Sequence, residues 1–207
     1  MSSVRTWFLL IGIMFPVLSM GGYEEGVHFI EIPFSESPET GNKVEVREFF
    51  WYGCPYCYSL EPVLERWLKN KPKAVTFVRT PAFMPRRINH GKAYYAFEAL
   101  GKLNTMHGKF FSAVQSDANR LEKVARIVAF VEKNGIDSKA FNKAYNSFDV
   151  DRKVKLATQL AQKYGINSVP TMVIDGRYLT NGSMAGGHEG LLKVVNYLVK
   201  RVAAEKK

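Results

Sequence analysis

The stretch Val44-Glu45-Val46-Arg47-Glu48-Phe49-Phe50-Trp51-Tyr52-Gly53-Cys54-Pro55-Tyr56-Cys57 decides the fold of this 207-residue chain. Residues 44–51 are rich in β-branched and aromatic side chains, which predicts a buried strand, and Gly53 breaks that strand. Beyond Cys57, apolar residues recur at helical spacing: Tyr58, Leu60, Val63, Leu64, Trp67 and Leu68. We therefore predict a strand that runs directly into a helix, with Cys54 at the helix start and the helix reaching about Lys69.

Cys54 and Cys57 are the only two cysteines of the chain. The backbone N–H groups at a helix start have no partner within the helix, so they stabilise a thiolate there. We expect Cys54 to have a lowered pKa and Cys57 to be its buried resolving partner. The pair is predicted to form a redox disulfide and to carry the catalysis.

A cysteine pair has two other common uses, a zinc site and a structural disulfide. A closed zinc site needs two further ligands at suitable spacing, but the four histidines are scattered: His28, His90, His107 and His188. A structural disulfide that closes a two-residue loop removes little entropy from the unfolded chain. We therefore favour redox chemistry and expect no metal ion and no cofactor.

The N-terminus has the layout of a secretory signal peptide. Arg5 precedes an apolar run over 7–18, and small residues follow at Ser19, Gly21 and Gly22. The run is shorter than the ~20 residues of a spanning helix, although an uncleaved membrane anchor is the alternative reading. We predict that residues 1–21 are a cleavable signal peptide and that the protein is exported, most plausibly to a bacterial periplasm. A lone CxxC pair suits an oxidising compartment.

The formal net charge of +10 could serve nucleic acid, an anionic membrane surface or acidic substrates. The basic residues are dispersed and no nucleic-acid-binding motif accompanies them. We interpret the charge as a solvated surface and expect no nucleic-acid partner.

The rest of the chain predicts one sheet domain interrupted by helices. Residues 27–32 and 74–79 favour strands, 88–165 is helical in pattern, and a last helix follows Gly186-Gly187. Asp175-Gly176 predicts a two-residue hairpin turn between strands 171–174 and 177–179. We predict an α/β sheet domain from residues 22–84 and 166–207, with an inserted helical domain over 85–165.

This arrangement resembles the thioredoxin fold with an all-helical insertion, and the residues resemble the disulfide-bond-forming A (DsbA) family over essentially the whole mature chain. Glu48-Phe49-Phe50, Cys54-Pro55-Tyr56-Cys57-Tyr58 and Glu61 are similar to the family's active-site stretch. Val169-Pro170-Thr171 matches its cis-proline loop, and an ordinary trans proline in a turn is the alternative. The resemblance implies that Val169 and Pro170 bind substrate and lie beside the cysteines. The apolar neighbours of Glu48 indicate burial, where a carboxyl group has a raised pKa and can relay protons for Cys57; a surface strand residue is the alternative.

Position 56 departs from the family, because many members carry histidine there. Tyr56 cannot become cationic, so we expect a weaker oxidant than a member with histidine. Pro55, Tyr56 and Glu48 are therefore candidates for tuning the redox pair. Arg79 is the nearest counterpart of the family's lysine beside the buried glutamate.

The resemblance implies an exported thiol:disulfide oxidoreductase that introduces disulfides into reduced client proteins. Its expected partners are those clients and a membrane-bound reoxidising protein similar to DsbB, and the protein is expected to be a monomer. The alternatives are a disulfide isomerase or reductase of the same fold, or a non-enzymatic chaperone or binding module. We expect no additional N-terminal dimerisation domain, which speaks against the commonest isomerase architecture.

Overall fold

A mixed five-stranded sheet forms the centre of the computed structural model, which describes residues 22–33, 38, 40–82, 87–116 and 121–206. The strand order is β1-β5-β4-β2-β3. The strands are β1 (Ile30–Glu31), β2 (Val44–Phe50), β3 (Val75–Pro81), β4 (Thr171–Ile174) and β5 (Tyr178–Asn181). Strand β2 pairs in parallel with β3, and the other pairings are antiparallel. The predicted signal peptide lies outside the described residues.

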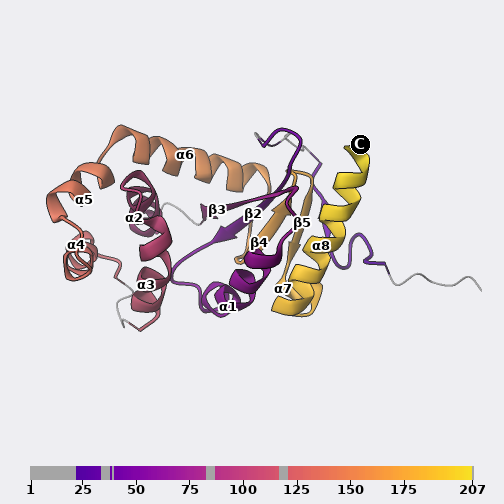
Figure 1. Cartoon of the computed structure of the whole chain (residues 1–207), viewed down its shortest axis with the longest axis horizontal. Helices are drawn as coiled ribbons and strands as arrows, with labels where there is room; N and C mark the ends of the chain where they lie inside the picture. Colours follow the sequence, from indigo (N-terminus) through magenta and orange to yellow (C-terminus); the bar gives the residue numbers. More distant parts are fainter. Residues whose placement is uncertain (1–21, 34–37, 39, 83–86, 117–120, 207) are drawn as a thin grey trace, which may run out of the picture.

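Eight helices surround the sheet in the described part of the chain (Figure 1). They are α1 (Pro55–Asn70), α2 (Ile88–Ala99), α3 (Leu103–Ser116), α4 (Val124–Lys133), α5 (Ser138–Tyr145), α6 (Phe148–Lys163), α7 (Gly182–Ala185) and α8 (His188–Glu205). Helices α2 to α6 all fall between β3 and β4 in the chain, where the sequence predicts a helical block. None of the helices described is long and apolar enough to cross a membrane.

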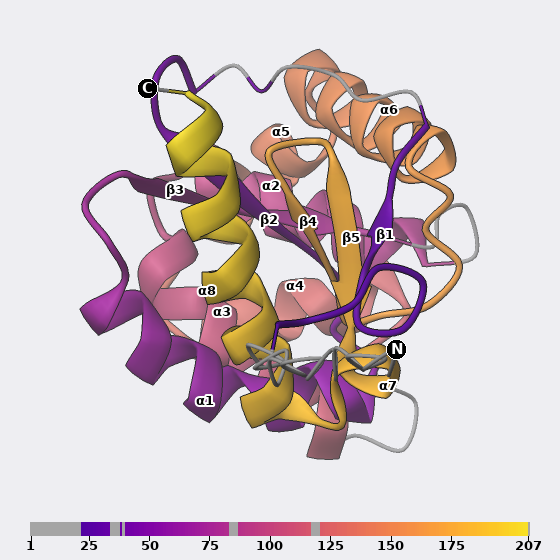
Figure 2. The same cartoon turned by 90° about the vertical axis from the view of Figure 1, so that its right-hand side faces the viewer.

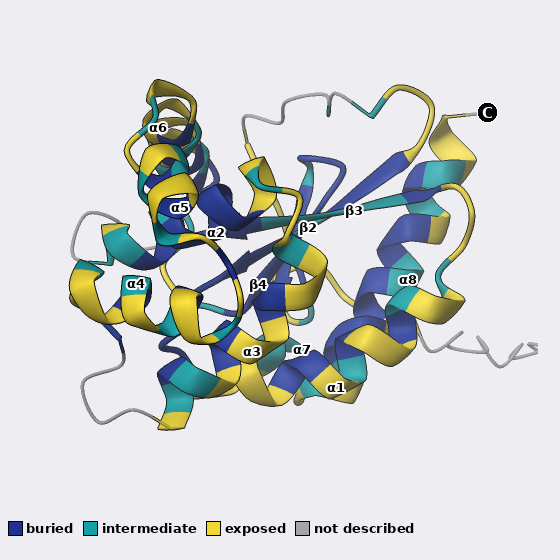
Figure 3. Ribbon diagram, turned by 60° about the vertical axis from the view of Figure 1, so that its left-hand side comes forward, coloured by how far each residue is buried: buried dark blue, intermediate teal, exposed yellow. Residues whose placement is uncertain are grey.

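Each face of the sheet has its own cover. Helices α1 and α8 pack on one face through a core that includes Val46, Leu64 and Leu198. Helix α6 covers part of the other face, where Phe49 and Tyr164 meet edge to face at 6.1 Å between ring centroids. Figure 2 shows α8 lying across the strands and α6 on the far side. The outward surfaces of α1 and α4–α6 are exposed (Figure 3), as expected for amphipathic helices around one core.

Two sequence predictions were wrong in detail. The expected edge strand over 27–32 is reduced to β1, whose two residues pair with Leu179 and Tyr178. The predicted two-residue turn at Asp175-Gly176 has positive φ at both residues, but the turn is three residues long. The last residue pair of the hairpin before the turn is Ile174 opposite Tyr178. Arg177 therefore belongs to the turn and not to the returning strand.

Candidate active site

Cys54 caps helix α1. Its backbone is extended (φ −89°, ψ 115°), and its Sγ accepts a hydrogen bond from the Cys57 N–H at 3.4 Å. Pro55 occupies the first helical position, where a missing N–H costs nothing and the fixed φ favours the helix. The sulfur of Cys54 thus takes the place of a capping oxygen, in the positive field of the helix N-terminus.

The turn before Cys54 is held by close packing. Strand β2 ends at Phe50, and the Cys54 N–H donates to the Trp51 carbonyl at 2.9 Å. A Cβ at Gly53 would lie 2.2 Å from the Trp51 ring, so only glycine fits there. The packing of the Trp51 ring against Gly53 therefore fixes the backbone conformation just before helix α1.

The two thiols are inequivalent. Both are free in the structure; the exposed fraction is 7% for Cys54 and 0% for Cys57. A hydrogen bond from the Cys57 thiol, then the backbone N–H groups of Cys57 and Tyr56 and the charge of Arg87, lower the pKa of Cys54 to about 6. Burial raises the pKa of Cys57 far above its ordinary value. The reduced pair thus favours a thiolate at Cys54 and a neutral thiol at Cys57.

The loop before β4 lies against Cys54. The Val169–Pro170 peptide bond is cis, and the Cys54 thiol donates to the Val169 carbonyl at 3.3 Å. The predictions of a cis bond and of contact with Cys54 are confirmed. A client peptide beside Cys54 would meet the backbone of this loop.

A cavity of about 370 Å³ opens next to this loop. Its lining contains no Asp, Glu, Lys or Arg and comprises Tyr56, Ser168, Val169, Pro170, Asn181, Gly182, Ser183, Gly187 and His188. Tyr56 is 70% exposed at its edge, and the hydroxyl of Ser59 lies 2.8 Å from His188 Nε2. The cavity offers backbone groups and hydroxyls within reach of a segment bound at Cys54.

A buried charged cluster lies behind the cysteines. Arg79 on β3 donates through Nε to Glu48 on β2 at 3.1 Å, and through Nη2 to both Glu61 oxygens of α1 at 3.1 and 3.0 Å. Burial raises the pKa of Glu48 to about 8, although Arg79 opposes the shift. Glu48 Oε1 has no hydrogen-bond partner among the described residues, which fits a carboxyl group that is neutral at neutral pH. The predicted burial of Glu48 is confirmed.

The cluster continues into the helical block. His107 Nε2 of α3 lies 3.4 Å from Glu61 Oε2, and its Nδ1 lies 2.9 Å from the Tyr52 hydroxyl. Burial would raise the pKa of Glu61, but His107 and Arg79 outweigh it and lower that pKa. Burial lowers the pKa of His107. An ionised Glu61 and a neutral His107 are therefore the expected forms at neutral pH.

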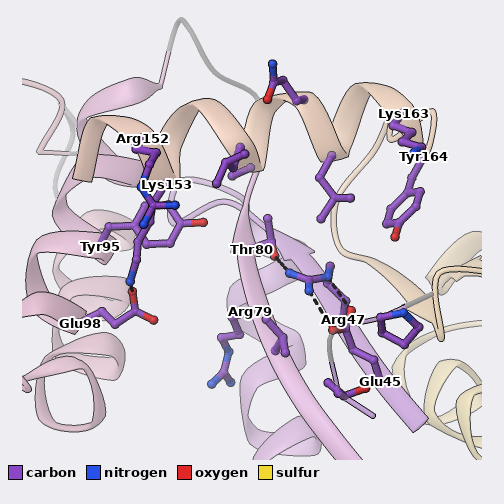
Figure 4. Close-up of a pocket in the computed structure, with 17 residues that line it drawn as sticks. Glu45, Arg47, Arg79, Thr80, Tyr95, Glu98, Arg152, Lys153, Lys163 and Tyr164 are labelled. Atoms are coloured by element: carbon purple, nitrogen blue, oxygen red, sulfur yellow. Dashed lines mark hydrogen bonds and ion pairs between the residues drawn. The ribbon is translucent and has the colours of Figure 1, made fainter. Parts of the chain in front are cut away.

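A larger cavity, of about 710 Å³, lies under α6 on the other side of the sheet (Figure 4). There Arg47 donates to Thr80 at 2.8 Å and pairs with Glu45, while Lys153 pairs with Glu98. Neither cysteine lines this cavity. It is therefore not the site of the thiol chemistry.

Sequence reasoning missed four side chains near the cysteines. In the sequence pattern, His90 and His107 are only scattered histidines that form no zinc site, and nothing there singles out Tyr52 or Arg87 for the chemistry. Arg87, His90 and His107 come from the helical block and contact Trp51 or Tyr52 across the fold, as in the hydrogen bond from Trp51 Nε1 to His90 Nδ1 at 3.0 Å. The one usable signal was a histidine within an otherwise buried helix face, as at His107.

Known proteins resemble this chain in both sequence and fold. A family model described as the DSBA-like thioredoxin domain matches residues 45–198. This chain belongs to that family. The predicted thioredoxin-like α/β fold with a helical insertion is confirmed, and so is the predicted enzyme class, a thiol:disulfide oxidoreductase.

Relatives and solved structures agree on the family. The chain is 36% identical over 197 residues to the thiol:disulfide interchange protein DsbA of Azotobacter vinelandii. The aligned residues cover 95% of this chain and 92% of the relative. It is 35% identical to the Pseudomonas aeruginosa DsbA over 89% of each chain. A crystal structure of P. aeruginosa DsbA has a TM-score of 0.83 at 35% identity, covering 89% of this chain and 97% of that one. The Xylella fastidiosa DsbA structure has a TM-score of 0.79 at 27% identity, covering 86% and 96%.

Proposed function

We propose that this DsbA-family oxidoreductase works as a dithiol oxidase, which passes its Cys54–Cys57 disulfide to reduced client proteins. The observation that carries the proposal is the contrast between the two sulfurs, with the pKa of Cys54 lowered to about 6. A stabilised Cys54 thiolate favours the reduced enzyme, by about 1.4 kcal/mol for each pKa unit, and so makes the disulfide a better oxidant. DsbA proteins are the known example of this effect.

The reaction begins when a client thiolate attacks Cys54 Sγ. The Cys54–Cys57 bond breaks, a mixed disulfide between Cys54 and the client forms, and the electron pair leaves on Cys57 Sγ. Cys57 takes up a proton because its pKa is raised. Glu48, whose pKa is about 8, holds a proton at neutral pH and is the proposed donor.

A second client thiolate completes the transfer. It attacks the client sulfur of the mixed disulfide, which forms the client disulfide and releases Cys54 as a thiolate. Two electrons pass from the client to the enzyme. The enzyme then needs an oxidant, and we propose a membrane-bound protein similar to DsbB.

Other site roles and the setting complete the proposal. Val169 and Pro170 hold the client segment beside Cys54, and Pro55 and Tyr56 tune the pair. We further propose an exported, periplasmic monomer with residues 1–21 as its signal peptide, a sheet domain of residues 22–84 and 166–207, and a helical domain of residues 85–165.

The two cysteines allow a test with matched substitutions. Oxidised wild-type protein should introduce disulfides into a reduced model client, and Cys54→Ser should abolish this, because the attacked sulfur is gone. Cys57→Ser should instead accumulate a mixed disulfide with a client that already carries a disulfide, because the Cys54 thiolate breaks that bond and releases one client thiolate, but no Cys57 sulfur is left to displace the client. Gel shifts under non-reducing conditions separate the two outcomes.

Full oxidation by Cys54→Ser would overturn the assignment. A wild-type protein that reshuffles a scrambled client but cannot oxidise a reduced one would favour the isomerase alternative.

A further inference from the structure

Trp51 is clamped between the helix start and the helical block. Its ring is 8% exposed and presses on Gly53, the residue before Cys54, and its carbonyl accepts the Cys54 N–H. Its indole N–H donates to His90 Nδ1 on α2 at 3.0 Å, and the two rings stack with 6.2 Å between centroids. These contacts hold the Trp51 ring in one orientation, close to the start of the helix that carries Cys54.

The guanidinium of Arg87 stacks on the Trp51 ring. Arg87 lies at the N-cap of α2, and its Cζ is 3.3 Å above the centre of the Trp51 ring. A guanidinium stacked on an aromatic face is held by cation–π attraction and by its flat shape, and it stays charged at every relevant pH. The Trp51 ring thus lies between the permanent positive charge of Arg87 and the backbone of Gly53 and Cys54.

We infer that Arg87 is a redox-tuning residue, which positions a positive charge on Trp51 and thereby stabilises the Cys54 thiolate. It supplies from the helical block a positive charge that Tyr56, which cannot become cationic, does not provide. The inference rests on the proposed function, because a stabilised thiolate matters most where Cys54 is the leaving group.

The electrostatics of the site agree with the geometry. Arg87 lowers the pKa of Cys54, after the larger effects of the Cys57 thiol and of the N–H groups of Cys57 and Tyr56. Arg87 is partly buried, so its field is less screened by water than that of an exposed side chain. Burial is the main cause of the raised pKa of the nearby Glu48, and the charge on Cys54 adds to it.

Substitutions at Arg87 separate charge from packing. Arg87→Met keeps an apolar stem on the tryptophan and removes the charge, Arg87→Lys keeps the charge, and Arg152→Met on α6 removes the same charge elsewhere. For each reduced protein the Cys54 thiolate is titrated by ultraviolet absorbance, and the redox pair is equilibrated with glutathione. Thermal melts check folding.

Arg87→Met should raise the pKa of Cys54 by about half a unit to one unit and shift the glutathione equilibrium about three- to tenfold towards the oxidised enzyme. Arg87→Lys should keep most of the wild-type values, and Arg152→Met should match wild type. If Arg87→Met does not fold, Arg87→Gln takes its place in the comparison.

Three results would overturn the inference: unchanged values in the neutral variants, equal shifts in Arg87→Met and Arg152→Met, or an Arg87→Lys protein that behaves like Arg87→Met. These readouts are equilibria of the enzyme alone. A wild-type protein that fails to oxidise clients would therefore count against the proposed function and leave the role of Arg87 measurable.

Discussion

At the scale of single residues, Cys54 and Cys57 are chemically identical side chains that the fold places in opposite environments. Cys54 receives N–H groups at the start of α1, whereas Cys57 points one turn further into a core with no exposed surface. Hydrogen bonds stabilise the charge on the first sulfur, and burial penalises it on the second. The difference arises from position in the helix and not from the CxxC pattern as such.

Tyr56 is the residue where a substitution should strengthen the oxidant. Tyr56→His places an ionisable ring beside the helix start, and its cationic form should lower the pKa of Cys54 and raise the reduction potential together. The change in pKa should be less than about one unit, because position 56 is 70% exposed and water screens a charge there. Thiolate titration and glutathione equilibration of both proteins measure the two quantities, and Tyr56→Phe controls for loss of the hydroxyl.

Opposite movements of the pKa and the potential in Tyr56→His would mean that residue 56 does not act through the Cys54 thiolate.

At the scale of elements, Arg79 ties three of them together. It brings β3 to Glu48 on β2 and to Glu61 on α1, and its side chain is only 17% exposed. Removal of one partner from a buried ion pair leaves a charge without compensation, which costs more than the pair itself contributes. The helix that carries the cysteines is therefore anchored by charge as well as by its apolar face.

Arg79→Met should lower the free energy of unfolding by about 3 kcal/mol at neutral pH, because Glu61 stays buried and ionised without its partner. The double variant Arg79→Met/Glu61→Gln should be less destabilised than Arg79→Met. Denaturant unfolding measures both. Arg66→Met is the matched control, since Arg66 pairs with Glu189 on the surface and should change stability by less than about 1 kcal/mol.

A double variant that is destabilised as much as Arg79→Met, or more, would show that Arg79 and Glu61 are not coupled in this way.

The elements themselves were largely predictable from the sequence. Strand β2, helix α1 and the helical block follow from local periodicity, and the contact between Cys54 and Val169 followed from the family motif. The length of β1 was not predictable, because its two paired residues depend on β5, which is almost 150 residues away in the chain. The cluster of Arg79, Glu61 and His107 and the stack of Arg87 on Trp51 also depend on long-range packing that no local pattern encodes.

At the scale of the whole molecule, the redox pair lies where the sheet meets the helical block. One core cluster joins Phe50, Trp51, Cys54 and Cys57 to buried residues of α2–α6, and a second joins the sheet to α1 and α8. Helix α1 thus has one end in each core. The helical block supplies His107 and Arg87 to the site, so it shapes the chemistry in addition to covering it.

The titration of the reduced wild-type protein tests the central claim most directly, namely that the fold makes one sulfur a thiolate and keeps the other neutral. Ultraviolet absorbance should show a single thiolate that forms with a midpoint near pH 6, and this signal should vanish in Cys54→Ser. Cys57 should remain protonated until the protein unfolds, because burial raises its pKa. Two thiols that ionise together near the ordinary cysteine pKa of about 8.5 would contradict the account.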